Sequence, residues 1–583
     1  MHASNLKKRF SRQNLLTALL TALSLSLILV IFAPLGTVLN NQSELPLDFY
    51  SYADCLLLPA FLLFAALFFI QLLALLIHET AFRIVSALIL GTETALCIQQ
   101  MFLNGKLISS AEGTVLGKIS DTEYTLNGII HLELILAFPL IALYRAKKRK
   151  DDAEDNFILR HITAFLACGM LLMQGSGFLT EWIRNSPGKY AANYADPKML
   201  SYKPTLSFSE EQNIVVFLTD RLDGEWCDAV LDEYPELRTE LDGFTYYQNT
   251  LSHYTYTFPS LAEMLTGTIY DFSEKDSYFA RCWQGENAFM RLRDNGFTVN
   301  LLPDARNCTN MLNELNASCD NLVDPVITEK YIDRAEIRRQ LLKLAAVHTA
   351  PYVVKSLCDD AASVLSYGEY IRYVFDENEL YSNGVVSLHS DIRLYDFLRS
   401  SAFDAAAEKP VCSFIHLNFA HDENPEMVSK LDIAGSNMLY RSIRANFETV
   451  FLYLHAAKEL GVYDNTTFIL IADHGYGVDE DEKSGQPLRP STAALMIKPA
   501  NAEHGALKTD STAALYNDML PASLLEYAGL DHSAYGDSFA DIIRSGKNSP
   551  RELIVIRDGK DPPLYYTVNG NAKDLANWQL LPT

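Results

Sequence analysis

The sequence predicts an α-helical membrane bundle of five spans followed by an α/β domain whose central sheet is mostly parallel. Two observations lead to this prediction. Five apolar stretches occur in the first third of the 583 residues, whereas apolar strands alternate with helical segments in the rest. The expected domains are a five-helix bundle at 1–184, a juxtamembrane linker at 185–212 and an outer domain at 213–583.

Each apolar stretch is near the length of about 20 residues that a helix needs to cross a bilayer. The first stretch is not read as a signal peptide, because it is long, has no clear cleavage site and is followed by further spans. The five stretches lie at 14–37, 52–77, 82–103, 127–145 and 158–182.

Basic residues predict the orientation of the bundle. Lys and Arg cluster before the first span, at positions 7–12, and between the fourth and fifth spans, at 145–150. Because basic loops stay in the cytoplasm, both segments are expected there. The expected protein is therefore a multi-pass protein of the cell membrane. Because five spans are an odd number, everything after about Trp182 is expected on the outer side of the membrane.

The acidity of the chain is concentrated in its second part. Residues 1–190 contain 15 Lys and Arg against 14 Asp and Glu, which leaves 33 against 58 for the remainder. Such a domain is a poor candidate for nucleic-acid binding, which needs a basic surface. An anionic substrate would need a local source of positive charge, most simply a metal ion.

The outer domain opens with a continuous apolar run, 213–219, that ends in Asp220. This pattern is typical of a buried parallel strand with a site residue at its carboxyl end, although an acid there is also a common cap or turn former.

The stretch 327–405 is expected to be a mostly helical insertion or a cover over the site. Further strands are expected near 245–247, 298–302, 413–420, 467–472 and 494–498.

A threonine and a proline lead into a short helix-forming run at Thr257–Gly267. A hydroxyl that opens a helix lies where backbone N–H groups favour a phosphate or sulfate group. The same arrangement is also an ordinary helix cap. Thr257 is therefore a candidate nucleophile, and Thr255 is the next candidate.

Two other strands end in ionisable groups. The strand at 467–472 is followed by Asp473 and His474, which can both point into one site. The strand near 413 runs into His421, which is the candidate substrate-binding residue, whereas His416 is assigned to the core of that strand. Asp220, Thr257, Asp473 and His474 together offer three oxygen ligands and one nitrogen, a set that suits Mn²⁺, Mg²⁺ or Zn²⁺.

These segments resemble the active-site motifs of the alkaline phosphatase and sulfatase superfamily. The nucleophile segment matches from Thr257 to the Leu-Thr-Gly at 265–267, and Asp220 and the Asp473-His474 pair match the two metal-binding strand ends. Thr257 replaces the cysteine of sulfatases and Leu261 replaces their arginine, so a true sulfatase is not expected. The resemblance implies an alkaline phosphatase-like fold for the outer domain.

Five spans before a domain of this kind resemble the lipoteichoic acid synthases and phosphoethanolamine transferases. The resemblance implies transfer of a phosphoglycerol or phosphoethanolamine headgroup from a membrane phospholipid, through a phosphothreonine at Thr257, to an extracytoplasmic glycan or lipid. A single divalent ion is expected, with Mn²⁺ as the first choice, because Leu417 breaks the Asp-x-x-x-His pattern of two-metal relatives. Asp220 stands where the synthases use a glutamate.

Two alternative functions remain open from the sequence. One is a membrane-tethered sulfatase-like hydrolase or phosphodiesterase, in which water replaces the acceptor. The other is a non-catalytic surface protein that retains the fold. Disulfides are permitted outside the cell, and Cys308 with Cys319 is the closest pair, but spacing does not decide the pairing.

Overall fold

The computed structural model divides the chain into two compact units. The first unit contains Met1–Ala195 and Ile327–Val374, and the second contains Asp196–Val326 and Phe375–Thr583. The structure describes all residues except 1–8, 43–44, 105–120, 149–152, 187–195, 274, 356–364, 366–367, 369, 388–389, 419, 479–486, 557–561 and 583.

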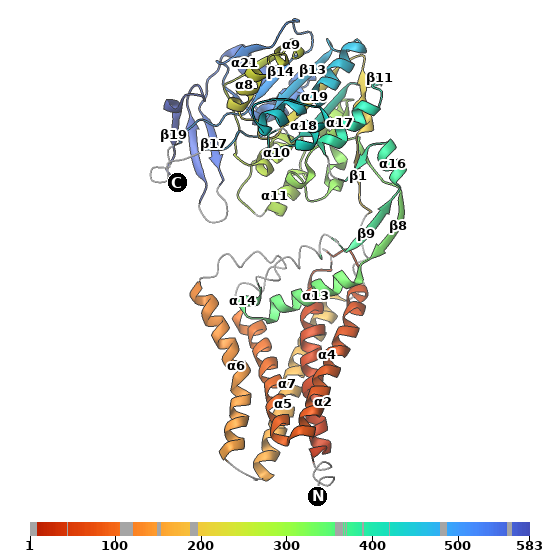
Figure 1. Ribbon diagram of the computed structural model, residues 1–583, viewed down its shortest axis with the longest axis vertical. Helices are drawn as coiled ribbons and strands as arrows, with labels where there is room; N and C mark the ends of the chain where they lie inside the picture. The colour runs from red at the N-terminus through yellow and green to blue at the C-terminus, as the bar shows by residue number, and fades with distance from the viewer. Residues whose placement is uncertain are drawn as a thin grey trace. The chain divides into compact units, whose positions relative to one another are not determined.

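Five helical segments of the first unit are long and apolar enough to cross a membrane, by length and composition (Figure 1). They coincide with the five predicted stretches. The first segment consists of two helices, α2 and α3, joined through one wide turn at Ile28–Phe32. The helices are α2 (Arg12–Leu27), α3 (Ala33–Asn40), α4 (Phe49–Ile77), α5 (Glu79–Ile98), α6 (Asp121–Lys148) and α7 (Ala153–Asn185).

The segment expected to be a helical insertion at 327–405 is divided between the two units. Its first part contains the strands β8 (Ile327–Ile332) and β9 (Ile371–Phe375), which pair with each other, and the helix α13 (Arg334–Thr349). The buried face of α13 packs in one cluster with apolar side chains of α3 and α4. This part therefore groups with the apolar helices of the first unit.

The rest of that segment lies in the second unit and is only partly helical. It contains α16 (Glu377–Ser382), β10 (Val385–Val386), α17 (Asp391–Ser400) and β11 (Asp404–Ala407). The end of the expected linker also belongs to this unit, because β1 (Met199–Ser201) pairs with β10, and β2 (Ser207–Ser209) pairs with β11.

Seven strands form the central sheet of the second unit, in the order β15-β4-β14-β13-β3-β12-β6. β14 runs antiparallel to both of its neighbours, and all other neighbouring pairs are parallel, so the predicted mostly parallel sheet is confirmed. The strands are β3 (Asn213–Thr219), β4 (Thr245–Tyr247), β6 (Thr298–Leu302), β12 (Val411–Leu417), β13 (Thr466–Ile471), β14 (Leu495–Lys498) and β15 (Lys508–Asp510).

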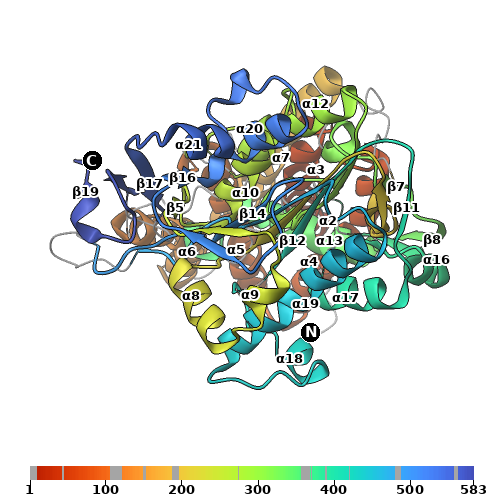
Figure 2. The same cartoon turned by 90° about the horizontal axis from the view of Figure 1, so that it is seen from above.

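Helices cover both faces of this sheet (Figure 2). Every residue of β3, β12 and β13 is buried, as expected for central strands that are apolar on both sides. One face carries α8 (Gly224–Glu233), α17 and α19 (Met438–Glu459), and the other carries α10 (Thr257–Thr266), α12 (Ala288–Asp294) and α20 (Leu520–Tyr527). The carboxyl ends of the three central strands therefore meet at one buried edge.

The cysteines that the structure describes are free thiols. Cys308 and Cys319 are both buried and unbridged, so the disulfide that the sequence left open is not formed. Cys358 lies outside the described residues.

Candidate active site

Three neighbouring strands bring the candidate residues together. Asp220 directly follows β3, and Asp473 and His474 follow β13 after one residue. β3 and β13 are parallel and paired up to Leu218 and Ile471, so both chain ends leave the sheet at the same level. The structure thus places side chains that are about 250 positions apart at one edge of the sheet.

Asp220, Asp473 and His474 form a compact cluster. One ligand atom of each lies within 4.8 Å of the others, and all three residues are buried. The atoms Asp220 Oδ1 and Asp473 Oδ2 have no hydrogen-bond partner in the described part of the protein. Buried carboxylate oxygens without partners are costly unless a cation is present. The donor set therefore fits a hard or borderline divalent metal ion.

Hydrogen bonds orient the atoms of this cluster. Asp473 Oδ1 accepts from the backbone N–H of Arg221 at 2.9 Å and of His474 at 2.8 Å, which leaves Oδ2 for a ligand. His474 Nδ1 lies 2.6 Å from the carbonyl oxygen of Gly475. Because a carbonyl only accepts, Nδ1 carries the proton and the lone pair of Nε2 faces the site.

Electrostatics in the cluster favour a bound cation. Burial, and next the charge of Asp220, raise the pKa of the Asp473 carboxyl above its ordinary value, while His474 opposes this. Two carboxylates that share a buried site repel each other when both are ionised. A divalent ion would remove this repulsion and satisfy the unpartnered oxygens.

Thr257 is the first residue of α10, and its hydroxyl faces the cluster. Thr257 Oγ1 lies 3.2 Å from His474 Nε2, and the residue is 6% exposed. The helix cap is Tyr256, which makes no side-chain capping bond. The hydroxyl of Thr257 is therefore not used as an ordinary helix cap, which was the alternative that the sequence allowed.

A cavity of about 340 Å³ opens in front of Thr257. His421 lines it, and its side chain is 45% exposed, with Nδ1 3.4 Å from Asp422 Oδ2. The lining residues are Arg221, Thr255, Tyr256, Thr257, His421, His474, Tyr476, Gly477, Val478, Val555 and Ile556. All candidate residues therefore lie at or beside one cavity.

Sequence reasoning missed two features of this site. His416 lies in the buried core of β12, as predicted, but its bond from Nε2 to Asp220 Oδ2, at 3.0 Å, was not foreseen. Arg221 lines the cavity, its guanidinium lies 5.0 Å from the ring centre of Tyr476, and no ion pair to it occurs among the described residues. The position of Arg221 next to Asp220 was the one signal in the sequence that could have indicated it.

Among the described residues of the second unit, two further groups combine acidic residues with a histidine. The first consists of His253, Glu263 and Asp518. There His253 Nδ1 bonds the Glu263 carboxylate at 2.9 Å, so this group is at least partly neutralised internally.

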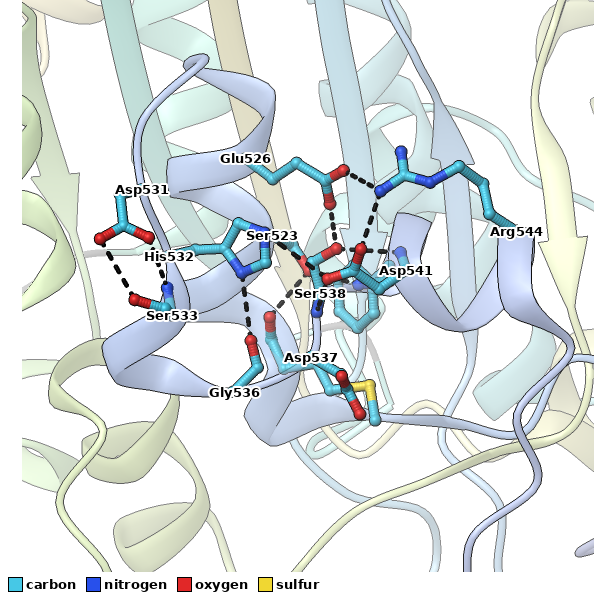
Figure 3. Close-up of polar contacts among 12 residues, drawn as sticks. Ser523, Glu526, Asp531, His532, Ser533, Gly536, Asp537, Ser538, Asp541 and Arg544 are labelled. Atoms are coloured by element: carbon cyan, nitrogen blue, oxygen red, sulfur yellow. Dashed lines mark hydrogen bonds and ion pairs between the residues drawn. The ribbon is translucent and has the colours of Figure 1, made fainter.

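The second group surrounds the start of α21 (Phe539–Ser545) and is shown in Figure 3. Arg544 bonds Glu526 at 2.5 Å and Asp541 at 2.8 Å. Ser538 and Asp541 form a reciprocal cap of the helix. This arrangement is explained by helix capping and ion pairing, and it needs no metal.

No protein-family model matches the chain, and no curated protein is significantly similar to it. Solved structures with a partly similar fold include a protein in the alkaline phosphatase superfamily from Vibrio parahaemolyticus, with 16% identity, a TM-score of 0.36 and coverage of 66% of this chain and 85% of that one. A phosphonate monoester hydrolase from Silicibacter pomeroyi has 14% identity, a TM-score of 0.34 and coverage of 64% and 88%. The C-terminal periplasmic domain of EcEptC from Escherichia coli has 10% identity, a TM-score of 0.33 and coverage of 63% and 96%. The functional conclusion therefore depends on the geometry of the site.

Proposed function

We propose that the protein is a membrane-bound, metal-dependent phosphotransferase. It moves a phosphoglycerol or phosphoethanolamine headgroup from a phospholipid, through a phosphothreonine, to an extracytoplasmic glycan or lipid. The observation that carries the proposal is the hydroxyl of Thr257, which lies 3.2 Å from His474 Nε2 beside two unpartnered carboxylate oxygens and faces a cavity. The five apolar helices support attachment to the bilayer that holds the donor.

The residues of the site have two roles, metal binding and contact with the phosphoryl group. Asp220, Asp473, His474 and Thr257 would hold a divalent ion, with Mn²⁺ as the first choice. Such an ion, when bound, stabilises the alkoxide of a threonine and neutralises charge on phosphoryl oxygens. The Arg221 guanidinium and His421 line the cavity and supply positive charge or hydrogen bonds to the phosphoryl oxygens that do not react.

The reaction consists of two displacements. Thr257 Oγ1 forms a bond to phosphorus, the bond from phosphorus to the diacylglycerol oxygen breaks, and diacylglycerol leaves with the proton of the threonine. A hydroxyl of the acceptor then attacks the phosphothreonine and returns Thr257 to its free form. Two in-line displacements retain the configuration at phosphorus. Water in the second step would make the protein a hydrolase.

The test uses the full-length protein in detergent with Mn²⁺ and either phosphatidylglycerol or phosphatidylethanolamine. We expect an added mass of phosphoglycerol or phosphoethanolamine on a peptide that contains Thr257, together with release of diacylglycerol. Thr257→Ala should give neither product. Thr239→Ala is the control that should give both, because Thr239 is exposed and does not line the cavity.

Each remaining outcome has a defined meaning. Release of diacylglycerol and free headgroup phosphate, without transfer to an added glycan or lipid, identifies the hydrolase. Undiminished turnover by Thr257→Ala refutes the nucleophile. No adduct and no release from either lipid, in a protein that binds Mn²⁺, refutes the donor class and favours the non-catalytic alternative.

A further inference from the structure

Tyr476 lies at the wall of the candidate catalytic cavity, two residues after His474 in the chain. It lines this cavity together with Arg221, and 38% of its surface is exposed. Three side chains from separate positions of the chain contact its ring, namely Arg221, Trp226 and Arg489. These contacts indicate what the ring does in the site.

The guanidinium group of Arg221 lies over two aromatic rings. Its central carbon is 5.0 Å from the ring centre of Tyr476 and 5.9 Å from that of Trp226. A guanidinium at this distance is attracted by the ring electrons and stacks on an aromatic face. The two rings also contact each other, with centres 5.0 Å apart and planes at 70°. Arg221 is therefore supported by a pair of rings.

Other contacts hold Tyr476 itself in place. The guanidinium carbon of Arg489 lies 3.9 Å from the ring centre of Tyr476. The backbone N–H of Tyr476 donates to Asp223 Oδ2 at 3.1 Å, and Asp223 is buried. Because its backbone and its ring are both held, Tyr476 offers Arg221 a fixed support.

The backbone of Arg221 has an unusual conformation. Its φ is 57°, in the left-handed region that favours glycine. Its N–H donates to Asp473 Oδ1 at 2.9 Å, so a candidate metal ligand holds it there. Strain of this kind persists where the surrounding structure enforces it, and it is concentrated at functional sites. The backbone of Arg221 is thus fixed next to the metal-ligand cluster.

The side chain of Arg221 needs a separate support. A free arginine side chain populates many rotamers, and ordering it opposes the binding of an anion. No described acidic residue forms an ion pair with Arg221 that would order it. Stacking uses the flat face of the guanidinium and leaves its in-plane N–H groups for oxygen atoms of a ligand. The ring of Tyr476 can therefore order Arg221 without neutralising it.

We propose that Tyr476 is a positioning residue that holds the Arg221 guanidinium at the cavity, where it binds the phosphoryl oxygens. The aromatic ring has this role, and the phenol hydroxyl does not. The inference rests on the proposed function for one point, the assignment of Arg221 to the phosphoryl group. Its test measures binding and does not depend on turnover.

The measurement is the dissociation constant of inorganic phosphate, determined by calorimetry with the full-length protein in detergent and Mn²⁺. Tyr476→Leu should weaken phosphate binding about tenfold, the size expected for loss of a cation–π contact at a partly desolvated site. Tyr476→Phe keeps the ring and should bind phosphate as the wild-type protein does. Tyr381→Leu is the control, because Tyr381 is an exposed tyrosine of the same unit that does not line the cavity.

A double-mutant cycle tests whether Tyr476 acts through Arg221. Arg221→Ala should weaken phosphate binding, and the addition of Tyr476→Leu should weaken it no further. The dissociation constant of Mn²⁺, measured by competition with a chelator, should be the same in all variants. A residue that only maintains the fold of the site would change metal binding as well. If Tyr476→Leu does not fold, Tyr476→Gln also lacks the ring and takes its place.

Equal phosphate binding by Tyr476→Leu and the wild-type protein overturns the proposal. So does the same loss in the Arg221→Ala background, because Tyr476 would then act independently of Arg221. A loss in Tyr476→Phe equal to that in Tyr476→Leu assigns the effect to the hydroxyl, and weaker Mn²⁺ binding by Tyr476→Leu assigns it to packing; each overturns the proposal.

The proposed function can fail separately from this inference. Coupled phosphate binding by Tyr476 and Arg221, without a phosphothreonine or release of diacylglycerol, would refute the transfer reaction and support the role of Tyr476. Absence of phosphate binding by the Mn²⁺-loaded wild-type protein would overturn the assigned role of Arg221 and, with it, that of Tyr476.

Discussion

His416 Nε2 lies 3.0 Å from Asp220 Oδ2, and both side chains are buried between adjacent parallel strands. Burial alone would lower the pKa of His416, but the hydrogen bond and the charge of Asp220 outweigh it and raise that pKa. The imidazole thus occupies one carboxylate oxygen and leaves Asp220 Oδ1 for a metal ion. If Asp220 holds a metal ion as proposed, His416 is a positioning residue that acts through Asp220.

We expect His416→Ala to weaken metal binding by about 10–100-fold, the loss that is usual when a residue that orients a metal ligand is removed. The dissociation constant for Mn²⁺, measured by competition with a chelator, checks this. His416→Gln, which keeps a donor, should recover part of the affinity. His455→Ala is the control, because that histidine pairs with Glu240 at the surface. An unchanged dissociation constant in His416→Ala would mean that this histidine only packs.

Arg221 is the residue best placed to bind a phosphoryl group. Because it lines the cavity without an ion pair to a described residue, its removal should weaken inhibition by inorganic phosphate by about tenfold or more, as expected for a hydrogen bond to a charged group of about 1.5–3 kcal/mol. The inhibition constants of Arg221→Ala and Arg221→Lys give the measurement. Arg238→Ala, which removes a surface ion pair with Asp232, should leave the constant unchanged. Equal constants for all variants would exclude Arg221 from phosphate binding.

Much of this site was predictable because its signals are local. Asp220 and Asp473 end continuous apolar runs, and Thr257 opens a helix after a strand, so short windows of sequence indicate them. His416 has no such signal, since it lies inside a fully buried strand and only pairing with β3 brings it to Asp220. The grouping of 327–374 with the apolar helices has no local signal either, because the packing of α13 on α3 joins residues about 300 positions apart.

Gly475 is required by close packing beside the Asp473-His474 pair. A Cβ there would lie 2.6 Å from Asp223 Oδ2 and 2.7 Å from the carbonyl oxygen of Thr492. Since a backbone atom cannot move aside cheaply, Gly475→Ala should lower the free energy of unfolding by about 1–3 kcal/mol. Chemical denaturation measures this, with Gly285→Ala as the control because a Cβ at Gly285 meets no atom within 4 Å. Equal midpoints for the two variants would contradict the prediction.

Asp518 makes stability depend on pH. Burial, and next the charge of Glu263, raise its pKa to about 7, and His253 only partly offsets this. The folded protein therefore holds a proton that the unfolded chain has already lost above the ordinary pKa of 3.8. The free energy of unfolding falls as the pH rises between these two values, by about 1.4 kcal/mol per pH unit at most.

His253 acts in the same direction. Burial lowers its pKa, but the hydrogen bond and charge of Glu263 prevail and raise it above 6.5, with Asp518 and Glu552 adding to this. A histidine with a raised pKa contributes stability that is present below its unfolded pKa and lost as the pH rises through the folded one. The decline in stability of the wild-type protein should therefore continue to pH values above 6.5.

Asp518→Asn separates the contribution of Asp518 to the pH dependence from that of His253. The substitution removes the titrating carboxyl and keeps nearly the same shape. We expect this variant to lose less stability than the wild-type protein as the pH rises from 5 to 7. The denaturant concentration at the unfolding midpoint, measured at steps of half a pH unit, checks this. Asp531→Asn is the control, since that carboxyl has a lowered pKa and does not titrate in this range. Parallel curves for Asp518→Asn and the wild-type protein would show that Asp518 is ionised in the folded state well below pH 7, and that His253 is paired with two carboxylates.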